Sequence, residues 1–390
     1  MDKQIQEPQK VSENKTSDEG VPAEATNEGS VNEENGNKKK HRLIKNIPLL
    51  IVEICILLLA IGIMYVVVTA TEEVERKDID EEKITINEEV AESLQMQTEE
   101  NEEVKGYRNI ALFGVDARDG ELGKGTRSDS IIIASINQDT QEIKLISVFR
   151  DTYLNLGNDT YNKCNAAYAQ GGPEQAINML NVNLDLVITD YVTIGFGGLI
   201  DSVDALGGIE MEVTSAEISH LNNYQLTMAK ELGVDYTPRE HSGRQLLNGM
   251  QATAYCRIRY TKGDDFRRAE RQRDVLSAMM EKAKTAPVSD LTNMVNSILP
   301  EIETSLGVNE ILSVLGNVAG YKVVASDGFP FEDHRRGANI GSKGSCVIPE
   351  TLEENVIKLH EVLYPEIDYK PSKQVESISA EIEETTKEYE

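Results

Sequence analysis

Four charged residues whose types suit phosphate and metal chemistry lie at the outer ends of one predicted β-hairpin. The hairpin consists of apolar strands at residues 130–136 and 142–148, joined by a turn over residues 137–140. Antiparallel pairing brings its two outer ends together. Guanidinium groups fit phosphate oxygens and a carboxylate suits a hard divalent cation, although a surface salt-bridge cluster would have the same composition. The four residues are Arg127, Asp129, Arg150 and Asp151.

A second group of basic residues follows Cys256. The alternation in TAYCRIRY predicts a strand with Arg257 and Arg259 on one face, where two unpaired arginines are poorly tolerated. Guanidinium groups held together repel one another unless an anion lies between them, so this group predicts a phosphate site. For Arg267 and Arg273 a solvated helix face is the simpler interpretation. In the helix predicted from about residue 266, three polar residues share one face at i, i+3 and i+4: Arg268, Arg271 and Gln272.

The elements that must position these residues alternate between strands and helices. A strand at Ile110–Gly114 ends on Asp116 and Arg118, an arrangement that either presents a site or forms a polar loop. Gly172-Pro173 starts an amphipathic helix. Further strands and helices follow, with residues 220–244 predicted as an irregular surface insertion and residues 351–366 as a closing helix. The pattern predicts an α/β (α+β-like) fold with a central mixed β-sheet flanked by helices.

The N-terminal sequence predicts a membrane anchor. A basic run, Lys38–Arg42, precedes a long apolar stretch, and Glu-rich sequence follows it. The stretch is long enough to cross about 30 Å of hydrocarbon, and the basic flank places the N-terminus in the cytoplasm and the C-terminal domain outside the cell. A cleaved signal peptide is the alternative, but the apolar run and the preceding tail are both too long for one. We therefore expect a single-pass protein of the cell membrane.

Composition narrows the class further. The formal net charge of −28 argues against a nucleic-acid partner. Three cysteines follow the span, and because three cannot all pair, we expect free buried thiols: Cys164, Cys256 and Cys346. The predicted organisation is a disordered cytoplasmic tail with a basic flank, a transmembrane signal-anchor helix, a charged stalk, an extracellular catalytic domain and an acidic disordered tail. These segments are residues 1–45, 46–70, 71–106, 107–365 and 366–390.

Seven segments between about Tyr107 and Lys284 together resemble the LytR–CpsA–Psr family. They are RNIALFGVDAR, RSDSIIIASIN, LISVFRDTY, NKCNAAYAQGG, LIDSVDALGGIEMEV, LNGMQATAYCRIRY and DDFRRAERQ. The resemblance implies an enzyme that transfers an anionic glycopolymer, of teichoic acid or capsule type, from an undecaprenyl-pyrophosphate carrier in the membrane to peptidoglycan. One departure is Arg267, where the family more often has a small residue.

The resemblance also implies roles for individual residues. Asp116 and Asp129 would hold Mg²⁺ (or Mn²⁺), and Asp265 would help to deprotonate the acceptor hydroxyl. Arg150, Arg257 and Arg259 would act in catalysis. The expected pyrophosphate-binding residues are Arg118, Arg127, Arg150, Lys163, Arg257, Arg259, Arg268, Arg271 and Gln272.

Two other functions are alternatives to transfer. A polyprenyl-pyrophosphate hydrolase would need the same Mg²⁺ and arginines, with water as the acceptor. A membrane-bound regulator of cell-envelope genes is disfavoured because an acidic domain outside the membrane has no route to DNA.

Overall fold

The computed structural model describes residues 77, 79–80, 83–99, 106–116, 122–123, 125–259, 261 and 264–389. All described residues belong to one compact unit of the chain, Tyr65–Glu390. The predicted cytoplasmic tail, the membrane span and Arg118 lie outside the described residues. Among the helices that are described, none combines the length and the apolar character needed to cross a membrane.

The domain is built on a mixed six-stranded sheet with the order β10-β3-β2-β1-β6-β9. The β1–β6 and β3–β10 pairs are parallel, and the other neighbours are antiparallel. The predicted hairpin is confirmed as β2 and β3, with Ile133 opposite Ile146. The strands are β1 (Tyr107–Val115), β2 (Ser128–Asn137), β3 (Glu142–Val148), β6 (Ile188–Ile194), β9 (Ile302–Thr304) and β10 (Lys322–Phe329).

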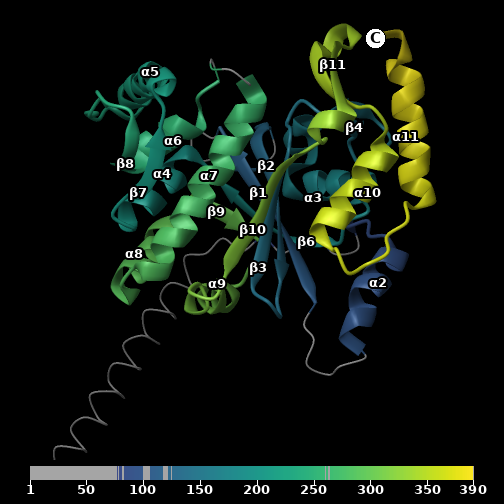
Figure 1. Cartoon of the computed structure of the whole chain (residues 1–390), viewed down its shortest axis with the longest axis horizontal. Coiled ribbons are helices and arrows are strands. Elements are labelled where there is room, and N and C mark those ends of the chain that lie inside the picture. The colour runs from purple at the N-terminus through teal and green to yellow at the C-terminus, as the bar shows by residue number, and fades with distance from the viewer. Residues whose placement is uncertain are drawn as a thin grey trace, which may run out of the picture. The chain divides into compact units, whose positions relative to one another are not determined.

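Helices cover both faces of this sheet, as Figure 1 shows. On one face, buried side chains such as Phe113 and Ile133 pack against α3 (Asn165–Leu184), α10 (Leu352–Leu363) and α11 (Lys373–Thr386). On the other, strand residues such as Ile132 pack against Leu276 of α7 (Asp264–Thr285). The predicted mixed sheet with flanking helices is therefore confirmed.

The remaining helices and strands pack around the central sheet and its flanking helices. Next to α7 lies a second buried cluster, formed by β7, β8 and the helices α4, α5 and α6. These elements are α4 (Phe196–Ala205), β7 (Ile209–Val213), α5 (Ser215–Leu232), β8 (Gly243–Leu247) and α6 (Gly249–Cys256). The others are α2 (Glu88–Glu99), β4 (Tyr153–Asn155), β5 (Tyr161–Lys163), α8 (Val288–Ile298), α9 (Val308–Gly316), β11 (Arg335–Asn339) and β12 (Ser345–Pro349), with short 3₁₀ turns after α8, β10, β11 and α11.

The helix predicted to start at Gly172-Pro173 is confirmed as the second part of α3. Gly172 adopts φ 70° and ψ −155°, which interrupts the helix immediately before Pro173. A positive φ of this kind suits glycine because it has no Cβ. The three cysteines named above are buried and free, as expected.

The predicted strand around Arg257 and Arg259 was wrong. Residues 249–256 form helix α6, and Arg257 is its C-terminal capping residue. Asn248 and Gln251 form a capping box at the start of this helix, in which the backbone N–H of Gln251 donates to Asn248 Oδ1 at 2.9 Å. This N-x-x-Q pattern is a helix-start signal that outweighs the period-two alternation that follows it.

Three other expectations need correction. Residues 220–232, predicted as irregular, belong to α5, whose capping box pairs Thr214 with Glu217. The acidic C-terminal segment is not disordered over 373–386, because Val375, Ile378 and Ile382 form a buried stripe on α11. The predicted stalk also belongs partly to the domain, since Val90 of α2 is buried in the main core.

Candidate functional site

The candidate site lies where several elements meet at one edge of the sheet. β1 and β3 end at this edge, β2 begins there, and β6 leads there into α4. The residues after α6 and the first turns of α7 reach the same edge. The elements deliver eight of the predicted site residues to one place: Asp116, Asp129, Arg150, Arg257, Arg259, Asp265, Arg268 and Gln272.

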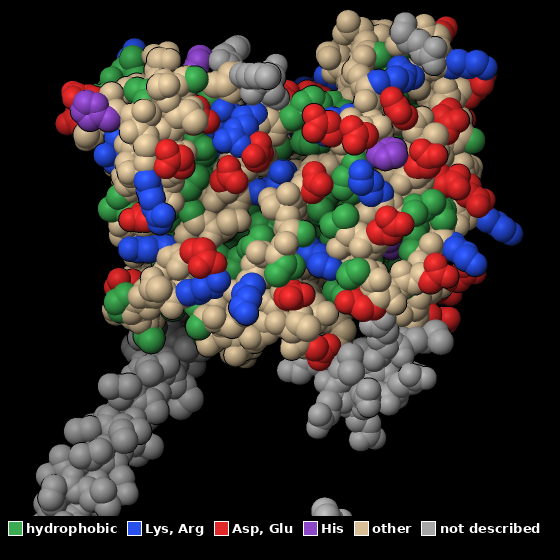
Figure 2. Space-filling model, viewed as in Figure 1, with side chains coloured by type: hydrophobic (Ala, Val, Ile, Leu, Met, Phe, Trp, Pro, Cys, Tyr) green, Lys and Arg blue, Asp and Glu red, His purple; other side chains and the backbone are tan. Residues whose placement is uncertain are grey.

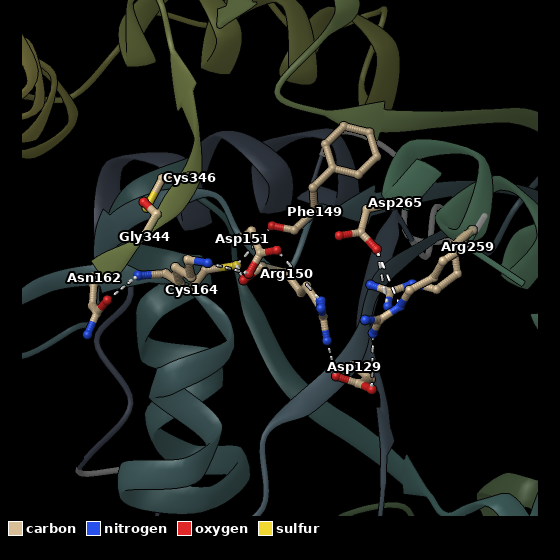
Figure 3. Close-up of polar contacts among 12 residues, drawn as sticks. Asp129, Phe149, Arg150, Asp151, Asn162, Cys164, Arg259, Asp265, Gly344 and Cys346 are labelled. Atoms are coloured by element: carbon tan, nitrogen blue, oxygen red, sulfur yellow. Dashed lines mark hydrogen bonds and ion pairs between the residues drawn. The ribbon is translucent and has the colours of Figure 1, made fainter. Parts of the chain in front are cut away.

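Arginine and aspartate side chains alternate through the centre of the site (Figure 3). Arg150 Nη1 donates a hydrogen bond of 2.6 Å to Asp129 Oδ1, and Arg259 Nη2 lies 3.8 Å from Asp129 Oδ2. Arg259 Nε is also 3.5 Å from Asp265 Oδ1, which Arg268 Nη1 approaches to 3.3 Å. We call these five residues the charged cluster. Asp129 and Asp265 thus hold three arginines in fixed positions.

The charged cluster retains unused capacity to bind an anion. Arg268 is only 4% exposed, and burial together with the charge of Arg150 lowers its pKa to about 10. Burial also opposes the charge of Arg150, but Asp129 and Asp151 outweigh it and raise the pKa. Within the described residues, Nε of Arg150, Nε of Arg268 and Nη1 of Arg257 are buried without a hydrogen-bond partner. An anion would satisfy these donors and relieve the crowding of positive charge.

A cavity of about 340 Å³ extends from the charged cluster between the sheet and the helices. Its charged end is formed by Asp116 and Asp129 with three arginines, Arg257, Arg259 and Arg268. The rest of its wall is mainly apolar and comes from β1, β2, β6, α4, α5 and α7: Leu112, Ile132, Ile194, Phe196, Leu199, Tyr224, Val275 and Leu276. We call it the first cavity. Its shape suits a ligand with an anionic head and an apolar chain.

The first cavity includes aromatic residues that sequence reasoning missed. The guanidinium of Arg257 lies 4.5 Å from the ring centroid of Phe196 and 5.6 Å from that of Tyr224. Both distances fit cation–π contacts, which hold Arg257 at the charged end. Tyr224 belongs to the segment predicted as irregular, where the T-x-x-E capping box at Thr214 and Glu217 was the available signal for a helix.

Arg271 does not line the first cavity although it shares a helix with Arg268. Its guanidinium donates to Glu217 Oε1 at 2.8 Å, to the Ile258 carbonyl at 3.0 Å and to Thr261 Oγ1 at 2.7 Å. These contacts fix the segment that carries Arg257 and Arg259. Its position therefore supports a positioning role rather than the expected pyrophosphate contact.

Two other predicted ligand residues lie beside the charged cluster rather than in it. Lys163 Nζ is 3.2 Å from Asp151 Oδ1, so this lysine neutralises the carboxylate that follows Arg150. Arg127 is exposed and immediately precedes β2. Neither side chain lines the first cavity.

The donor set also fits the expected metal ion. Asp116 and Asp129 both line the first cavity at its charged end. Mg²⁺ keeps several waters and is commonly held by one or two carboxylates together with substrate phosphates. In the described part of the chain no group of three or more metal-ligating side chains occurs, so the two aspartates would share the ion with waters or ligand phosphates.

The chain as a whole is strongly acidic. Acidic and basic side chains are interspersed over the face drawn in Figure 2, and the formal net charge is −28. A local excess of arginine over aspartate at the first cavity therefore differs from the average of the chain. Such a local excess favours a compact polyanionic group over an extended polyanion.

The chain is similar in sequence to named teichoic acid transferases. The chain is 31% identical over 209 residues to a protein of Enterococcus faecalis named polyisoprenyl-teichoic acid–peptidoglycan teichoic acid transferase TagU, covering 53% of this chain and 64% of that one. It is 27% identical over 274 residues to the TagV protein of that name from Bacillus subtilis, covering 67% and 65%. It therefore spans slightly less than two thirds of the length of either relative.

The fold matches solved structures too. The structure of TagT bound to LI-WTA superposes with a TM-score of 0.54 at 20% identity, covering 68% of this chain and 92% of that one. The model of the LytR_cpsA_psr family matches residues 63–342, which include all of the charged cluster and the first cavity. The chain belongs to the LytR_cpsA_psr (LytR–CpsA–Psr) family.

Proposed function

We propose that this protein transfers an anionic glycopolymer, of teichoic acid or capsule type, from an undecaprenyl-pyrophosphate carrier to peptidoglycan. The observation that carries the proposal is the first cavity, an apolar space that ends on arginines and aspartates. The names of the TagU and TagV relatives support the choice of donor and acceptor. The cavity volume lies within the range of small-ligand sites.

The carrier lipid would bind with its pyrophosphate at the charged end and its chain between sheet and helices. Leu112, Ile132 and Leu276 would pack against the first part of the chain. Arg257, Arg259 and Arg268 would donate hydrogen bonds to the phosphate oxygens. The buried donors on Arg257 and Arg268 that lack a partner would then be satisfied.

The reaction would be a phosphoryl transfer in which the protein positions groups and neutralises charge. A hydroxyl oxygen of peptidoglycan forms a bond to the polymer-side phosphorus, the phosphorus–oxygen bond to polyprenyl phosphate breaks, and that phosphate leaves. The hydroxyl proton passes to Asp265, whose side chain is 35% exposed. Arg259 and Arg268 stabilise the negative charge that develops on the leaving oxygens.

Mg²⁺ (or Mn²⁺) held by Asp116 and Asp129 would supply additional neutralisation of the pyrophosphate. Membrane attachment through residues 46–70, with the N-terminus in the cytoplasm, would keep the domain beside its lipid-linked donor. Both features belong to the proposal.

A reconstituted assay tests this function. The full-length protein in lipid nanodiscs is mixed with a polyprenyl-pyrophosphate-linked saccharide, Mg²⁺ and peptidoglycan oligomers, and the products are identified by mass spectrometry. We expect a phosphodiester between saccharide and glycan, and its loss in Asp129→Ala and Arg268→Gln. Arg267→Gln is the matched control, because this neighbouring arginine on α7 pairs with Glu270 and lines no part of the first cavity.

The products distinguish the competing functions. Free saccharide phosphate with peptidoglycan left unmodified would refute transfer and favour the hydrolase. Tight binding of the donor without any product would indicate a lipid-binding protein. A regulator would show neither donor binding nor product formation.

A further inference from the structure

A second cavity of about 210 Å³ touches the charged cluster from another side. Four residues line both cavities: Asp129, Ser130, Arg268 and Gln272. Asp116, Arg257 and Arg259 line only the first cavity, and Arg150, Asp151 and Asp265 line only the second. The charged cluster therefore borders two adjoining spaces.

The position of Asp265 assigns different tasks to the two spaces. Its carboxylate is the candidate proton acceptor, and it lines the second cavity but not the first. A proton acceptor must lie within hydrogen-bond reach of the attacking hydroxyl. The hydroxyl therefore has to approach from the second cavity, while the apolar chain of the donor occupies the first.

The walls of the second cavity suit a sugar ring. Phe149 and Phe266 line it with their rings 4.7 Å apart, and Phe266 remains 37% exposed although Arg335 lies 3.9 Å from its ring centroid. An exposed aromatic ring beside charged hydrogen-bonding groups matches a pyranose, which presents C–H bonds on its faces and hydroxyls at its edge. The volume is smaller than the roughly 300–1,000 Å³ of sites for drug-sized ligands, which favours a single ring.

The opposite wall is held in place by backbone hydrogen bonds. The β11–β12 hairpin contributes Gly337, Ser345 and Val347 to the lining. The Val347 amide donates to the Asp151 carbonyl at 2.9 Å, which ties β12 to the segment that follows Arg150. A wall fixed in this way is preorganised for a ligand.

We propose that the second cavity is the acceptor subsite, where one sugar ring of the peptidoglycan acceptor binds with its reacting hydroxyl at Asp265. This inference rests on the proposed transferase function and adds the location of the acceptor.

The test compares variants on the two sides of the charged cluster. Phe266→Ala removes the aromatic surface of the second cavity. Phe196→Ala removes the corresponding phenylalanine of the first cavity, which lies under Arg257 at 4.5 Å. Gly337→Leu places a larger side chain in the wall of the second cavity and so narrows it. The substitution causes no clash at the backbone, because a Cβ at Gly337 meets nothing closer than the Cys346 carbonyl at 3.9 Å. Gly316→Leu on α9 is the matched control, since a Cβ at Gly316 meets nothing within 4 Å and this glycine lines neither cavity.

We expect Phe266→Ala to raise the KM for the peptidoglycan oligomer roughly 3- to 10-fold while the Kd for the lipid donor stays unchanged. Phe196→Ala should raise the Kd for the lipid donor while the KM for the peptidoglycan oligomer stays unchanged. Gly337→Leu should lose most of its transfer but still bind the donor and release saccharide phosphate to water. Gly316→Leu should behave as the parent. An unchanged acceptor KM in both Phe266→Ala and Gly337→Leu, or weaker donor binding in both, would overturn the proposal; the latter would assign the cavity to a sugar of the donor.

Acceptor binding measured without donor separates this inference from the proposed function. The probe is a soluble peptidoglycan disaccharide added to the full-length protein and followed by calorimetry. Binding that Gly337→Leu abolishes would support the subsite even if the parent protein hydrolyses the donor instead of transferring it. Binding that is absent from the parent, or unaffected by Gly337→Leu, would refute the subsite even if transfer occurs.

Discussion

Replacement of Arg271 by methionine should unfold the domain more easily without removing a ligand contact. Arg271 and Glu217 are 1% and 2% exposed, and their side chains meet at 2.8 Å. Methionine keeps much of the apolar volume of the arginine stem but leaves the Glu217 carboxylate buried without its cation. Removing one partner of a buried ion pair costs about 3–5 kcal/mol. We expect a loss of that size in the free energy of unfolding at pH 7.

The loss should depend on pH because Glu217 changes its protonation. Burial favours the neutral acid, but hydrogen bonds from Thr214 and Arg271 outweigh it and lower the pKa of Glu217. Without Arg271 the folded-state pKa should rise above the value of about 4.3 in an unfolded chain. The folded variant then binds more protons than its unfolded state, so its stability falls as the pH rises through this region. The difference between parent and variant should therefore be larger at pH 7 than at pH 4.5.

Urea unfolding followed by circular dichroism measures both effects. The double variant Glu217→Gln/Arg271→Met carries no buried charge at this pair, so it should be more stable than Arg271→Met alone. Gln272→Ala serves as the comparison on the next position of α7, with little loss of stability but weaker donor binding. If Arg271→Met unfolds at the same urea concentration as the parent yet loses affinity for polyprenyl pyrophosphate, Arg271 is a ligand residue and the structural argument fails.

Three further predictions concern other parts of the domain. Burial lowers the pKa of His360 to about 4, so between pH 6.5 and pH 4 the unfolded state binds a proton that the folded state does not. The free energy of unfolding should therefore drop by about 3 kcal/mol across this range. Urea unfolding at several pH values should show this drop, and His360→Gln should abolish it. Ile382→Ala on α11 should cost about 2–5 kcal/mol in the same assay, whereas a disordered tail would show no change. Arg268→Met should stabilise the ligand-free domain by about 1–3 kcal/mol in thermal scans, because it removes a buried charge that lies close to other positive charges. It should also abolish the rise in Tm that polyprenyl pyrophosphate produces in the parent.

Short-range patterns in the sequence were sufficient to predict the central part of the site. The β2–β3 hairpin could be predicted because its strands are adjacent in the chain and its turn residues are polar. Asp129 and Arg150 then had to meet, since antiparallel pairing leaves no other arrangement of the two ends. The parallel β1–β6 and β3–β10 pairs join segments that are far apart in sequence, and no local pattern specifies them.

Arg257 and Arg259 reach the first cavity by a route that the sequence reasoning did not foresee. The expected strand would have placed them on one face by alternation. Instead α6 ends at Cys256, and the following residues leave the helix with their backbone held by Arg271 through the Ile258 carbonyl. The predicted strand and the observed helix end both bring the two guanidinium groups to the same cavity. A correct prediction of the site residues therefore does not imply a correct prediction of the secondary structure that carries them.

The different positions of Arg268, Arg271 and Gln272 show why a shared helix face does not identify a shared ligand. Successive residues of an α-helix are rotated by about 100°, so Gln272 lies about 40° to one side of Arg268 and Arg271 about 60° to the other. Val275 and Leu276, at about −20° and 80° on the same scale, also line the first cavity, which therefore faces the Gln272 side. Arg271 lies at the margin of this face, where a long side chain reaches either the cavity or the neighbouring helix. Glu217 of α5 decides between them, because a buried carboxylate binds the guanidinium at 2.8 Å even without a ligand. That partner is 54 positions away in the sequence, so periodicity within α7 cannot reveal it.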